Sequence, residues 1–436
     1  MVQVLIRRLS ACALGLCLLP AAATTAAELG GRHTLAVDVE VAYPGIDSDL
    51  GAWPEGGFGK LRFGNDSDSP IANRIVAEYN GRIAPTLWSR AVLDYVDGGE
   101  PAVGLTEAYL DWRPVPRSAN QHRFRFGAFY PAFSLENGGP AWSSPFTNSF
   151  SAINAWYGEE VRPIGAEWTL KRHLGYAGSP HEISVFAAGF YGNDPAGTLL
   201  FWRGFAVHDR QTRLNERLPL PPLLQFDAGG NLVSRTERRL DPIAEIDDEP
   251  GFYGGVEWRY ARRALLQLAH YDNRADPYAF RDGQWGWDTR FTQLAAQFSL
   301  PAEFGLVMQW MRGSTDWLTA TTPTGLTTAT TVLASDKFDA RFLLLTRRIG
   351  GKHRVSLRHD RFDFQRPGQI VIDDGHAWTV AYEFAAGKRL TLRAEWLEIE
   401  STRDLWPFFY GLPDHQREAQ LQIGLRLALL DDSGTP

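Results

Sequence analysis

Cysteine is almost absent from this sequence. Cys12 and Cys17 are the only two among 436 residues, and both lie close to the N-terminus. Everything after them can form neither a disulfide nor a thiolate metal site. The fold must therefore be held together without either device.

Long apolar runs are also missing. Beyond residue 27, no stretch approaches the ~20 consecutive apolar residues that a membrane-spanning helix needs, and the mean hydropathy is -0.25. This pattern excludes a helical membrane protein. A transmembrane β-barrel is still allowed, because its strands present apolar side chains to lipid only at every second residue.

Lysine is scarce, and arginine supplies most of the positive charge. Lysine occurs only at positions 60, 171, 337, 352 and 388. Without the two arginines of the N-terminal segment, 42 of the 44 cationic residues remain against 51 acidic ones, a formal charge of -9. This acidic balance disfavours a nucleic-acid partner. Arginine offers a rigid fork that suits carboxylates and phosphates.

The N-terminus has the layout of a secretory signal peptide. Arg7 and Arg8 precede an apolar stretch that ends at Leu19, and small residues follow. Cleavage after Ala23 or Ala27 would fit this pattern. We expect residues 1–27 to be a signal peptide and residues 28–436 to form one domain.

The rest of the chain alternates between apolar and polar residues. In HTLAVDVEVAY, residues 33–43, Val37 and Val39 share one parity, whereas Asp38 and Glu40 share the other. Such alternation is typical of strands with one apolar face. It recurs in about sixteen segments, namely 33–43, 72–80, 86–96, 103–113, 121–131, 163–172, 181–191, 251–261, 263–273, 289–300, 303–313, 336–348, 352–363, 376–385, 388–400 and 416–429.

The connections between these segments alternate between short and long. Tight turns on the periplasmic side and long loops on the extracellular side are typical of outer-membrane barrels. We therefore predict an all-β fold, an antiparallel transmembrane β-barrel of about 16 strands with both termini on the periplasmic side. Aromatic residues near the strand ends, such as Trp112, Tyr130, Trp287 and Trp396, are expected to form girdles at the membrane interfaces.

Charged residues occupy the parity that should face the interior. A wet lumen lined by both signs of charge would orient polar solutes and set ion preference. The alternative is that these residues form salt bridges that only stiffen the wall. The expected channel-lining residues are Arg90, Asp94, Glu107, Asp111, Arg123, Arg125, Glu167, Arg341, Arg358 and Arg393.

Two long loops are candidates for shaping the pore. Residues 132–162 follow the Arg123 and Arg125 pair and carry Glu136, Glu159 and Glu160. This loop could fold inward as a constriction or lie exposed on the surface. The much longer loop 192–250 is expected on the extracellular side, and its acidic stretch 245–249 could bind divalent cations, lie among lipid head groups or form a solvated tip.

Enzyme signatures are missing from the sequence. There is no G-x-S-x-G and no H-E-x-x-H motif, and His353 and His359 lie beside arginines that would repel a metal ion. We expect no catalytic residue, no metal and no cofactor. Two alternatives to an open pore remain, an outer-membrane hydrolase of the phospholipase type and a plugged structural or adhesive barrel.

The segment RFRFGAFYP, followed by a long loop, resembles the phosphate-selective (O/P type) family of Gram-negative outer-membrane porins. The resemblance implies a passive, solute-selective channel of the outer membrane, in a family that is often homotrimeric and whose arginines or lysines attract anions. Its partners would be small hydrophilic solutes, outer-membrane lipids and lipopolysaccharide. The sequence departs from the family in its scarcity of lysine and in ending LRLALLDDSGTP, without a terminal aromatic residue.

Overall fold

The computed structural model describes residues 33–65, 71–96, 101–175, 179–223, 235–319, 331–366, 370–404 and 406–430. The predicted signal peptide lies outside these residues. No helix among them is long and apolar enough to cross a membrane. Strands make up most of the described chain.

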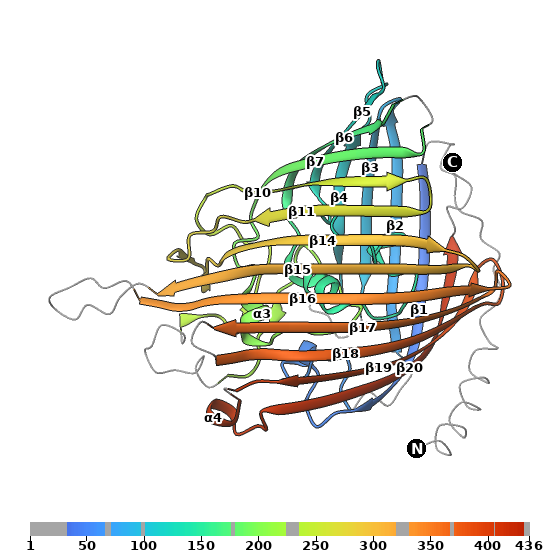
Figure 1. Cartoon of the computed structure of the whole chain (residues 1–436). Helices are drawn as coiled ribbons and strands as arrows, with labels where there is room; N and C mark the ends of the chain where they lie inside the picture. The colour runs from blue at the N-terminus through green and yellow to red at the C-terminus, as the bar shows by residue number, and fades with distance from the viewer. Residues whose placement is uncertain are drawn as a thin grey trace.

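Sixteen strands of the described chain pair in chain order and close into one antiparallel barrel (Figure 1). The first and last strands complete the closure, with Val39 opposite Leu427. This confirms the predicted all-β fold and strand number. The strands are β1 (His33–Asp47), β2 (Ile71–Ala84), β3 (Leu87–Tyr95), β4 (Val103–Trp112), β5 (Asn120–Ala128), β6 (Ile164–His173), β7 (His181–Tyr191), β10 (Gly251–Tyr260), β11 (Ala264–Asp272), β14 (Asp288–Leu300), β15 (Phe304–Thr319), β16 (Thr331–Ile349), β17 (His353–Arg366), β18 (Ile370–Ala385), β19 (Leu390–Thr402) and β20 (His415–Leu430).

Short turns join the strands at one end of the barrel and long loops join them at the other (Figure 1). The end with the tight turns is the periplasmic one in bacterial barrels. The loops contain the remaining small elements. These are the hairpins β8 (Leu218–Pro219) with β9 (Arg239–Leu240) and β12 (Phe280–Arg281) with β13 (Gln284–Trp285), the helices α2 (Ala152–Glu160), α3 (Thr198–Trp202) and α4 (Trp406–Tyr410), and the 3-10 turns η2 (Trp53–Glu55) and η3 (Pro140–Trp142).

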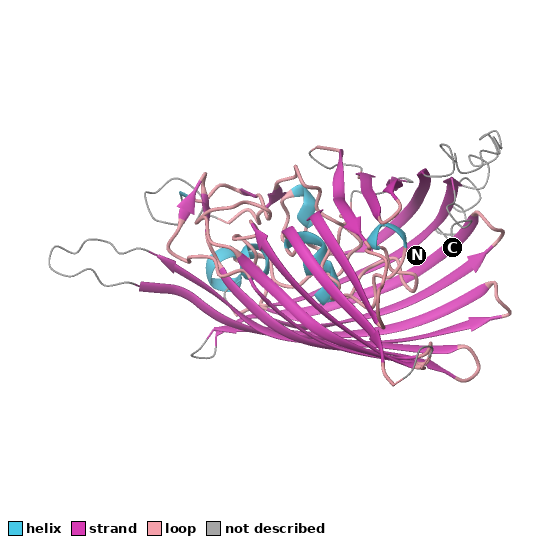
Figure 2. Cartoon of the chain, turned by 90° about the horizontal axis from the view of Figure 1, so that it is seen from above, coloured by secondary structure: helices cyan, strands magenta, loops and turns pink. Residues whose placement is uncertain are grey.

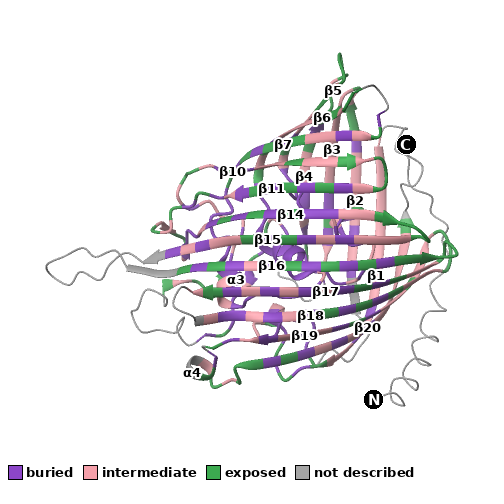
Figure 3. Ribbon diagram, viewed as in Figure 1, coloured by how far each residue is buried: buried purple, intermediate pink, exposed green. Residues whose placement is uncertain are grey.

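Buried and more exposed residues alternate along the strands of the wall (Figure 3). On β16, Leu343 and Leu345 are exposed, whereas Phe342 and Leu344 are buried inside. A closed barrel satisfies its backbone hydrogen bonds internally, which allows its outer face to lie in lipid. The outer face carries many exposed apolar side chains, among them Leu110, Trp112, Phe126, Val185, Val256, Leu268, Leu294, Leu357, Val380 and Leu392.

The aromatic girdle is only partly as predicted. Trp112, the last residue of β4, is exposed on the outer face at a strand end, whereas Trp396 is exposed in the middle of β19. Tyr130 and Trp287 are buried, because the loops that hold them fold inward. Aromatic spacing in the sequence did not separate girdle residues from residues of these loops.

Several long loops enter the barrel. Seen from above, helices lie within the curve of the strand wall (Figure 2). Every residue of α2 is buried, and this helix contacts β16 and β17. Residues 196–213 of the loop between β7 and β10 are also largely buried. The lumen is therefore narrowed from its extracellular side by ordered chain.

Candidate functional site in the barrel lumen

One wall of the lumen is covered by an aromatic cluster around α2. The Trp156 ring lies 5.5 Å from Phe338 of β16 and 5.4 Å from Phe291 of β14, measured between ring centroids. Edge-to-face pairs at such separations are favourable beyond the area that they bury. Strands β14 to β17 thus turn apolar side chains inward on this side, where a wholly wet lumen would require polar ones.

Arg358 fixes the loop between β5 and β6 to this wall. Its guanidinium donates to Glu136 at 2.7 Å, to Asp360 at 2.8 Å and to the carbonyl of Ser149 at 2.6 Å. All three ionised side chains are buried. Arg358, predicted to line the channel, and Glu136, predicted on a constriction loop, therefore lie in contact with each other and away from solvent.

The same loop is also bound through η3 to the wall at β2, five strands around the barrel from β17. The backbone N–H of Ala141 donates to Glu78 of β2 at 3.0 Å. Arg74, also on β2, donates to the carbonyl of Ala141 at 3.4 Å and to Asp94 of β3 at 3.0 Å. The loop is thus hydrogen-bonded to the wall at two places and crosses the interior of the barrel.

The two acidic residues at the end of α2 bind the second inward loop. Arg203 donates to both oxygens of Glu159 at 2.6 Å, and the His208 ring lies 2.8 Å from the same carboxylate. Burial alone would raise the pKa of Glu159, but Arg203 and His208 outweigh it and lower the pKa to about 2. Glu159 is therefore a charged anchor and does not face the pore.

Glu160 has a different environment. Its carboxylate accepts hydrogen bonds from the backbone N–H groups of Leu199 at 2.9 Å and Leu200 at 3.3 Å, and from the Trp156 indole at 2.7 Å. Burial raises the pKa of Glu160 to about 7 despite these donors, since no cation contacts the carboxylate. Glu160 thus connects α2 to the start of α3 and titrates near neutral pH.

A third loop, between β1 and β2, joins this inward structure through Lys60. The ammonium donates to Asp373 of β18 at 2.7 Å and to the carbonyl of Phe205 at 2.7 Å. Burial lowers the pKa of Lys60 to about 8, against the opposing effect of Asp373. Lys60 therefore ties two loops to one strand near the extracellular end.

At the periplasmic end of the lumen, exposed cations contact carboxylates that are largely covered. On β4 and β5, Asp111 is only 4% exposed, whereas its two partners Arg113 and Arg123 are 57% and 38% exposed. On the adjoining strands, Glu182 is 10% exposed beneath Lys171 and Arg259, which are 42% and 45% exposed. We call Arg113, Arg123, Lys171 and Arg259 the vestibule cations.

Arg123 and Arg125 have opposite environments, although the sequence placed them together. Arg125 is buried and donates to both oxygens of Glu167, at 2.8 and 2.7 Å. Its guanidinium carbon also lies 4.2 Å from the centre of the Phe129 ring. The Arg125–Glu167 pair stiffens the wall, as the salt-bridge alternative proposed, and only Arg123 faces open space.

Two further ion-pair groups lie at mid-lumen. Arg90 contacts Glu107 at 3.4 Å and also bridges to Glu78. On β19, four strands around the wall from β3, Arg393 contacts Glu383 at 3.2 Å and Glu40 at 3.6 Å. These two arginines are partly exposed, so both groups can contact a solute.

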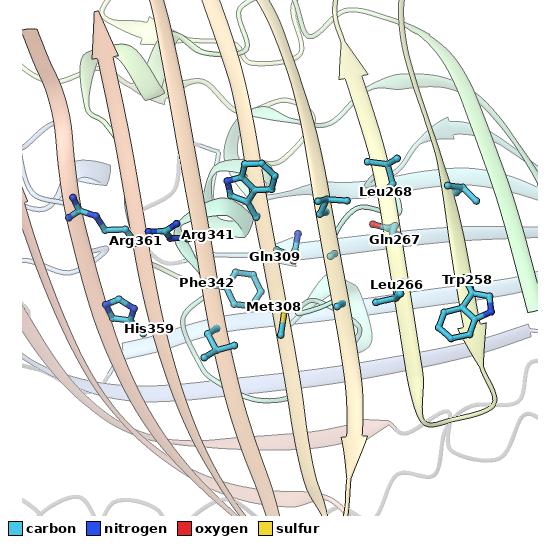
Figure 4. A pocket seen from close by; sticks show the side chains of 16 residues that line it. Trp258, Leu266, Gln267, Leu268, Met308, Gln309, Arg341, Phe342, His359 and Arg361 are labelled. Atoms are coloured by element: carbon cyan, nitrogen blue, oxygen red, sulfur yellow. The ribbon is translucent and has the colours of Figure 1, made fainter. Parts of the chain in front are cut away.

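Arg341 faces the outside of the barrel, opposite to the predicted side (Figure 4). Both parities of β16 carry apolar residues, so alternation alone did not decide the side. The aromatic cluster around α2 takes Phe338 and Phe342 inward, which turns Arg341 outward. Arg341 lies beside Arg361 and His359 at one end of an apolar groove that is lined by Trp258, Leu266, Leu268, Leu294, Met308 and Leu343.

Several buried or lumen-facing charges were not predicted from the sequence. Arg74 and Glu78 share the inward parity of β2 with Val76, so a stricter parity count would have found them. Arg203 and His208 lie in an inward loop without periodicity, and no local signal identifies them. The hydrolase alternative required a Ser–His pair on the lipid-facing side, and within the described ranges no serine hydroxyl is hydrogen-bonded to a histidine ring.

No family model and no curated protein sequence matches this chain. Among solved structures, it is similar to the outer-membrane channel DcaP of Acinetobacter baumannii, with a TM-score of 0.53 and 10% identity over 93% of this chain and 100% of that chain. An anion-selective porin from Comamonas acidovorans gives a TM-score of 0.46 and 12% identity over 91% and 99%. The trimer form of OmpT, an outer membrane protein of Vibrio cholerae, gives 0.48 and 10% over 91% and 99%.

At these sequence identities, the similarity shows a shared fold and nothing more. This conclusion rests on the Acinetobacter channel, which has a TM-score of 0.53. The predicted O/P subfamily finds no support in these matches. The closed 16-strand barrel and its apolar outer face agree with this fold. The chain is an outer-membrane β-barrel with the fold of porin-like channels.

Proposed function

We propose that this protein is a passive outer-membrane channel for small hydrophilic solutes, with a preference for anions. The observation that carries the proposal is the arrangement of charge at the periplasmic vestibule. Asp111 and Glu182 are covered, whereas the four cations that contact them are exposed; Glu257, which contacts Arg259 at 2.9 Å, is 18% exposed. A solute entering the vestibule therefore meets guanidinium and ammonium groups first.

This arrangement reconciles anion preference with a formal charge of -9. The field that a solute experiences depends on the charges nearest to it, and a low-dielectric wall focuses that field into the lumen. Rings of arginine and lysine favour anions in pores. Because four exposed cations face two covered acids, Asp111 and Glu182, and one partly exposed acid, Glu257, the vestibule surface carries a local positive excess.

The inward loops supply the size selection in this proposal. The loop between β5 and β6 is held at Arg358 on β17 and at Glu78 on β2. Solute would pass beside it, along the partly exposed ion pairs of Arg90 and Arg393. Opposed charges of this kind orient dipolar solutes as they cross.

Reversal potential in planar bilayers under a KCl gradient tests the proposal. We expect wild-type protein to favour chloride, and glutamine at all four vestibule cations to shift the potential towards potassium. A matched control replaces the outward-facing Arg290, Arg312, Lys337 and Arg341, which changes the net charge equally on the outer face. Equal shifts in both variants, or no conductance from folded wild-type protein, would contradict the proposal.

A second candidate function is a barrel closed by its loops. It is favoured by the burial of residues 196–213 and by the anchors of this segment at Glu159 and Asp373. Deleting the loop between β7 and β10 would then create conductance that the intact protein lacks. If the protein is instead the passive channel proposed above, the intact protein would already conduct before the deletion.

We also propose outer-leaflet lipids, including lipopolysaccharide, as partners of the outer wall. Leu343 and Leu345 of β16 are exposed below Arg341, whereas Asp339 and Lys337 lie above it. Arg341 thus marks the level at which the outer face changes from apolar to polar. Among the described residues it forms no ion pair, so a lipid phosphate can bind its guanidinium.

A homotrimer is the proposed assembly. The outer wall at β4 and β5 carries a flat aromatic patch, in which Trp112 and Phe124 stack at 5.0 Å between ring centroids. Phe126 continues the stack, with its ring centroid 6.5 Å from that of Phe124. Such a surface can pack against a second copy in lipid. Native mass spectrometry in detergent would give the mass of three chains, and a purely monomeric protein would refute the assembly.

A further inference from the structure

The extracellular side of the barrel holds a further candidate site, whose role does not depend on channel activity. The loop between β7 and β10 begins and ends next to an acidic cluster. Asp194 lies three residues beyond β7, and Glu245 and Asp247 lie shortly before β10. One carboxylate oxygen from each residue lies within 4.8 Å of the other two.

Asp194 is the central member of this cluster. The residue is 0% exposed, and its Oδ2 accepts the backbone N–H of Ile246 at 2.5 Å. Its Oδ1 is buried and has no hydrogen-bond partner. A buried carboxylate oxygen without a partner is costly, because desolvation is then uncompensated.

Neighbouring groups leave the negative charge of the cluster unbalanced. No lysine or arginine in the described part of the chain forms an ion pair with any of the three acids; Arg281 bridges instead to Asp248 at 3.0 Å.

The surrounding backbone holds the three carboxylates in place. Glu245 accepts the N–H of Gly192 at 2.5 Å and that of Asp248 at 2.7 Å. Asp247 accepts the N–H of Glu249 at 2.8 Å and that of Asp276, from the next extracellular loop. The cluster is therefore preorganised and joins two loops.

We propose that Asp194, Glu245 and Asp247 bind a Ca²⁺ ion that ties together the two ends of this loop. The donors are all oxygens, which suit a hard cation, and no histidine or cysteine is present to favour zinc. Oxygens on opposite sides of a Ca²⁺ ion are about 5 Å apart, so three oxygens within 4.8 Å fit around one ion. Loop carbonyls and water would complete its coordination.

Terbium luminescence tests the site on the folded full-length barrel. Trp287 donates its backbone N–H to the carbonyl of Asp194 at 2.8 Å, so excitation of tryptophan should sensitise a Tb³⁺ ion bound there. We expect Ca²⁺ to displace Tb³⁺ at lower concentration than Mg²⁺ does. We also expect Asp194→Asn to weaken Ca²⁺ binding by roughly tenfold or more.

Two further variants make the result decisive. Glu245→Gln should weaken binding similarly, which covers the case in which Asp194→Asn does not fold. Asp248→Asn is the matched control, because this residue is adjacent in sequence but is exposed and paired with Arg281. Ca²⁺ should also raise the thermal midpoint of wild-type protein but not of Asp194→Asn. Sensitised Tb³⁺ that Ca²⁺ does not displace, or equal affinity in wild type and both ligand variants, would overturn the proposal.

Discussion

Arg358 and Glu136 form a fully buried ion pair at 2.7 Å across 222 positions of sequence. The pair joins the wall of the barrel to the loop that crosses its interior. Asp360 shares the same guanidinium at 2.8 Å. Because both acids depend on one cation, the position of the loop depends on Arg358 more than on any single apolar contact of α2.

Replacing Arg358 with leucine should therefore destabilise the barrel strongly. The change leaves Glu136 and Asp360 buried without their cation, and removing one partner of a buried pair costs about 3–5 kcal/mol. We expect a lower midpoint in heat-modifiability gels, together with protease cleavage within residues 132–162. Arg341→Leu is the control, because Arg341 lies on the adjacent strand but is exposed and unpaired. Equal midpoints for the two variants would contradict the anchoring role.

Substitutions at the two arginines of RFRFGAFYP should affect different properties: those at Arg125 should lower stability, and those at Arg123 should change ion selectivity. Arg125→Leu leaves Glu167 buried beside Tyr253, whose hydroxyl donates to it at 2.7 Å, so the thermal midpoint should fall. Arg123→Gln removes an exposed cation and should shift the reversal potential with little loss of stability. Measuring both properties in both variants checks this. A shift in reversal potential from Arg125→Leu alone would reverse the assignment.

The outer wall should hold lipid phosphate at Arg341 and Arg361. Replacing both with alanine should reduce the lipopolysaccharide that copurifies with the barrel, measured by mass spectrometry of extracted lipid A. Arg172→Ala with Arg347→Ala is the control, because these exposed arginines lie near the periplasmic turns. Equal lipid A content in wild type and in the double variant, Arg341→Ala with Arg361→Ala, would exclude the lipid site.

The sequence predicted the structure where the environment of a side chain follows from its odd or even position along a strand. The strands and the closure of the barrel could be predicted, because lipid selects apolar side chains at every second position. Arg341 was assigned to the wrong face, since β16 has apolar residues on both parities. The deciding contact is with Trp156, which lies in a loop without periodicity.

Ion-pair partners were also beyond prediction. The strand register places Asp111 opposite Arg125, yet Asp111 pairs with Arg113 and Arg123. Arg125 lies opposite Glu167 on its other side and pairs there. Arg125 has a carboxylate opposite it on both neighbouring strands, and it pairs with Glu167, which also accepts the hydroxyl of Tyr253 from β10.

Glu160 should make stability fall as pH rises towards neutrality. Its pKa is raised to about 7 in the folded protein, against 4.5 as the ordinary value. Between these values the folded state binds more protons than the unfolded one, so raising the pH lowers the free energy of unfolding. The total effect is about 3 kcal/mol, complete above pH 7 and absent below pH 4.5.

Glu160→Gln isolates this effect. Wild type should lose more stability than the variant between pH 5 and pH 8, measured as the difference in the thermal midpoints of the two proteins at each pH. Glu159→Gln is the opposite case, because its pKa is lowered to about 2 and its stabilisation is lost only as pH falls below 4.5. That variant should be less stable than wild type at both pH 5 and pH 8. A constant difference between wild type and Glu160→Gln across this range would mean that the carboxylate is already ionised at pH 5, balanced by the N–H groups of α3.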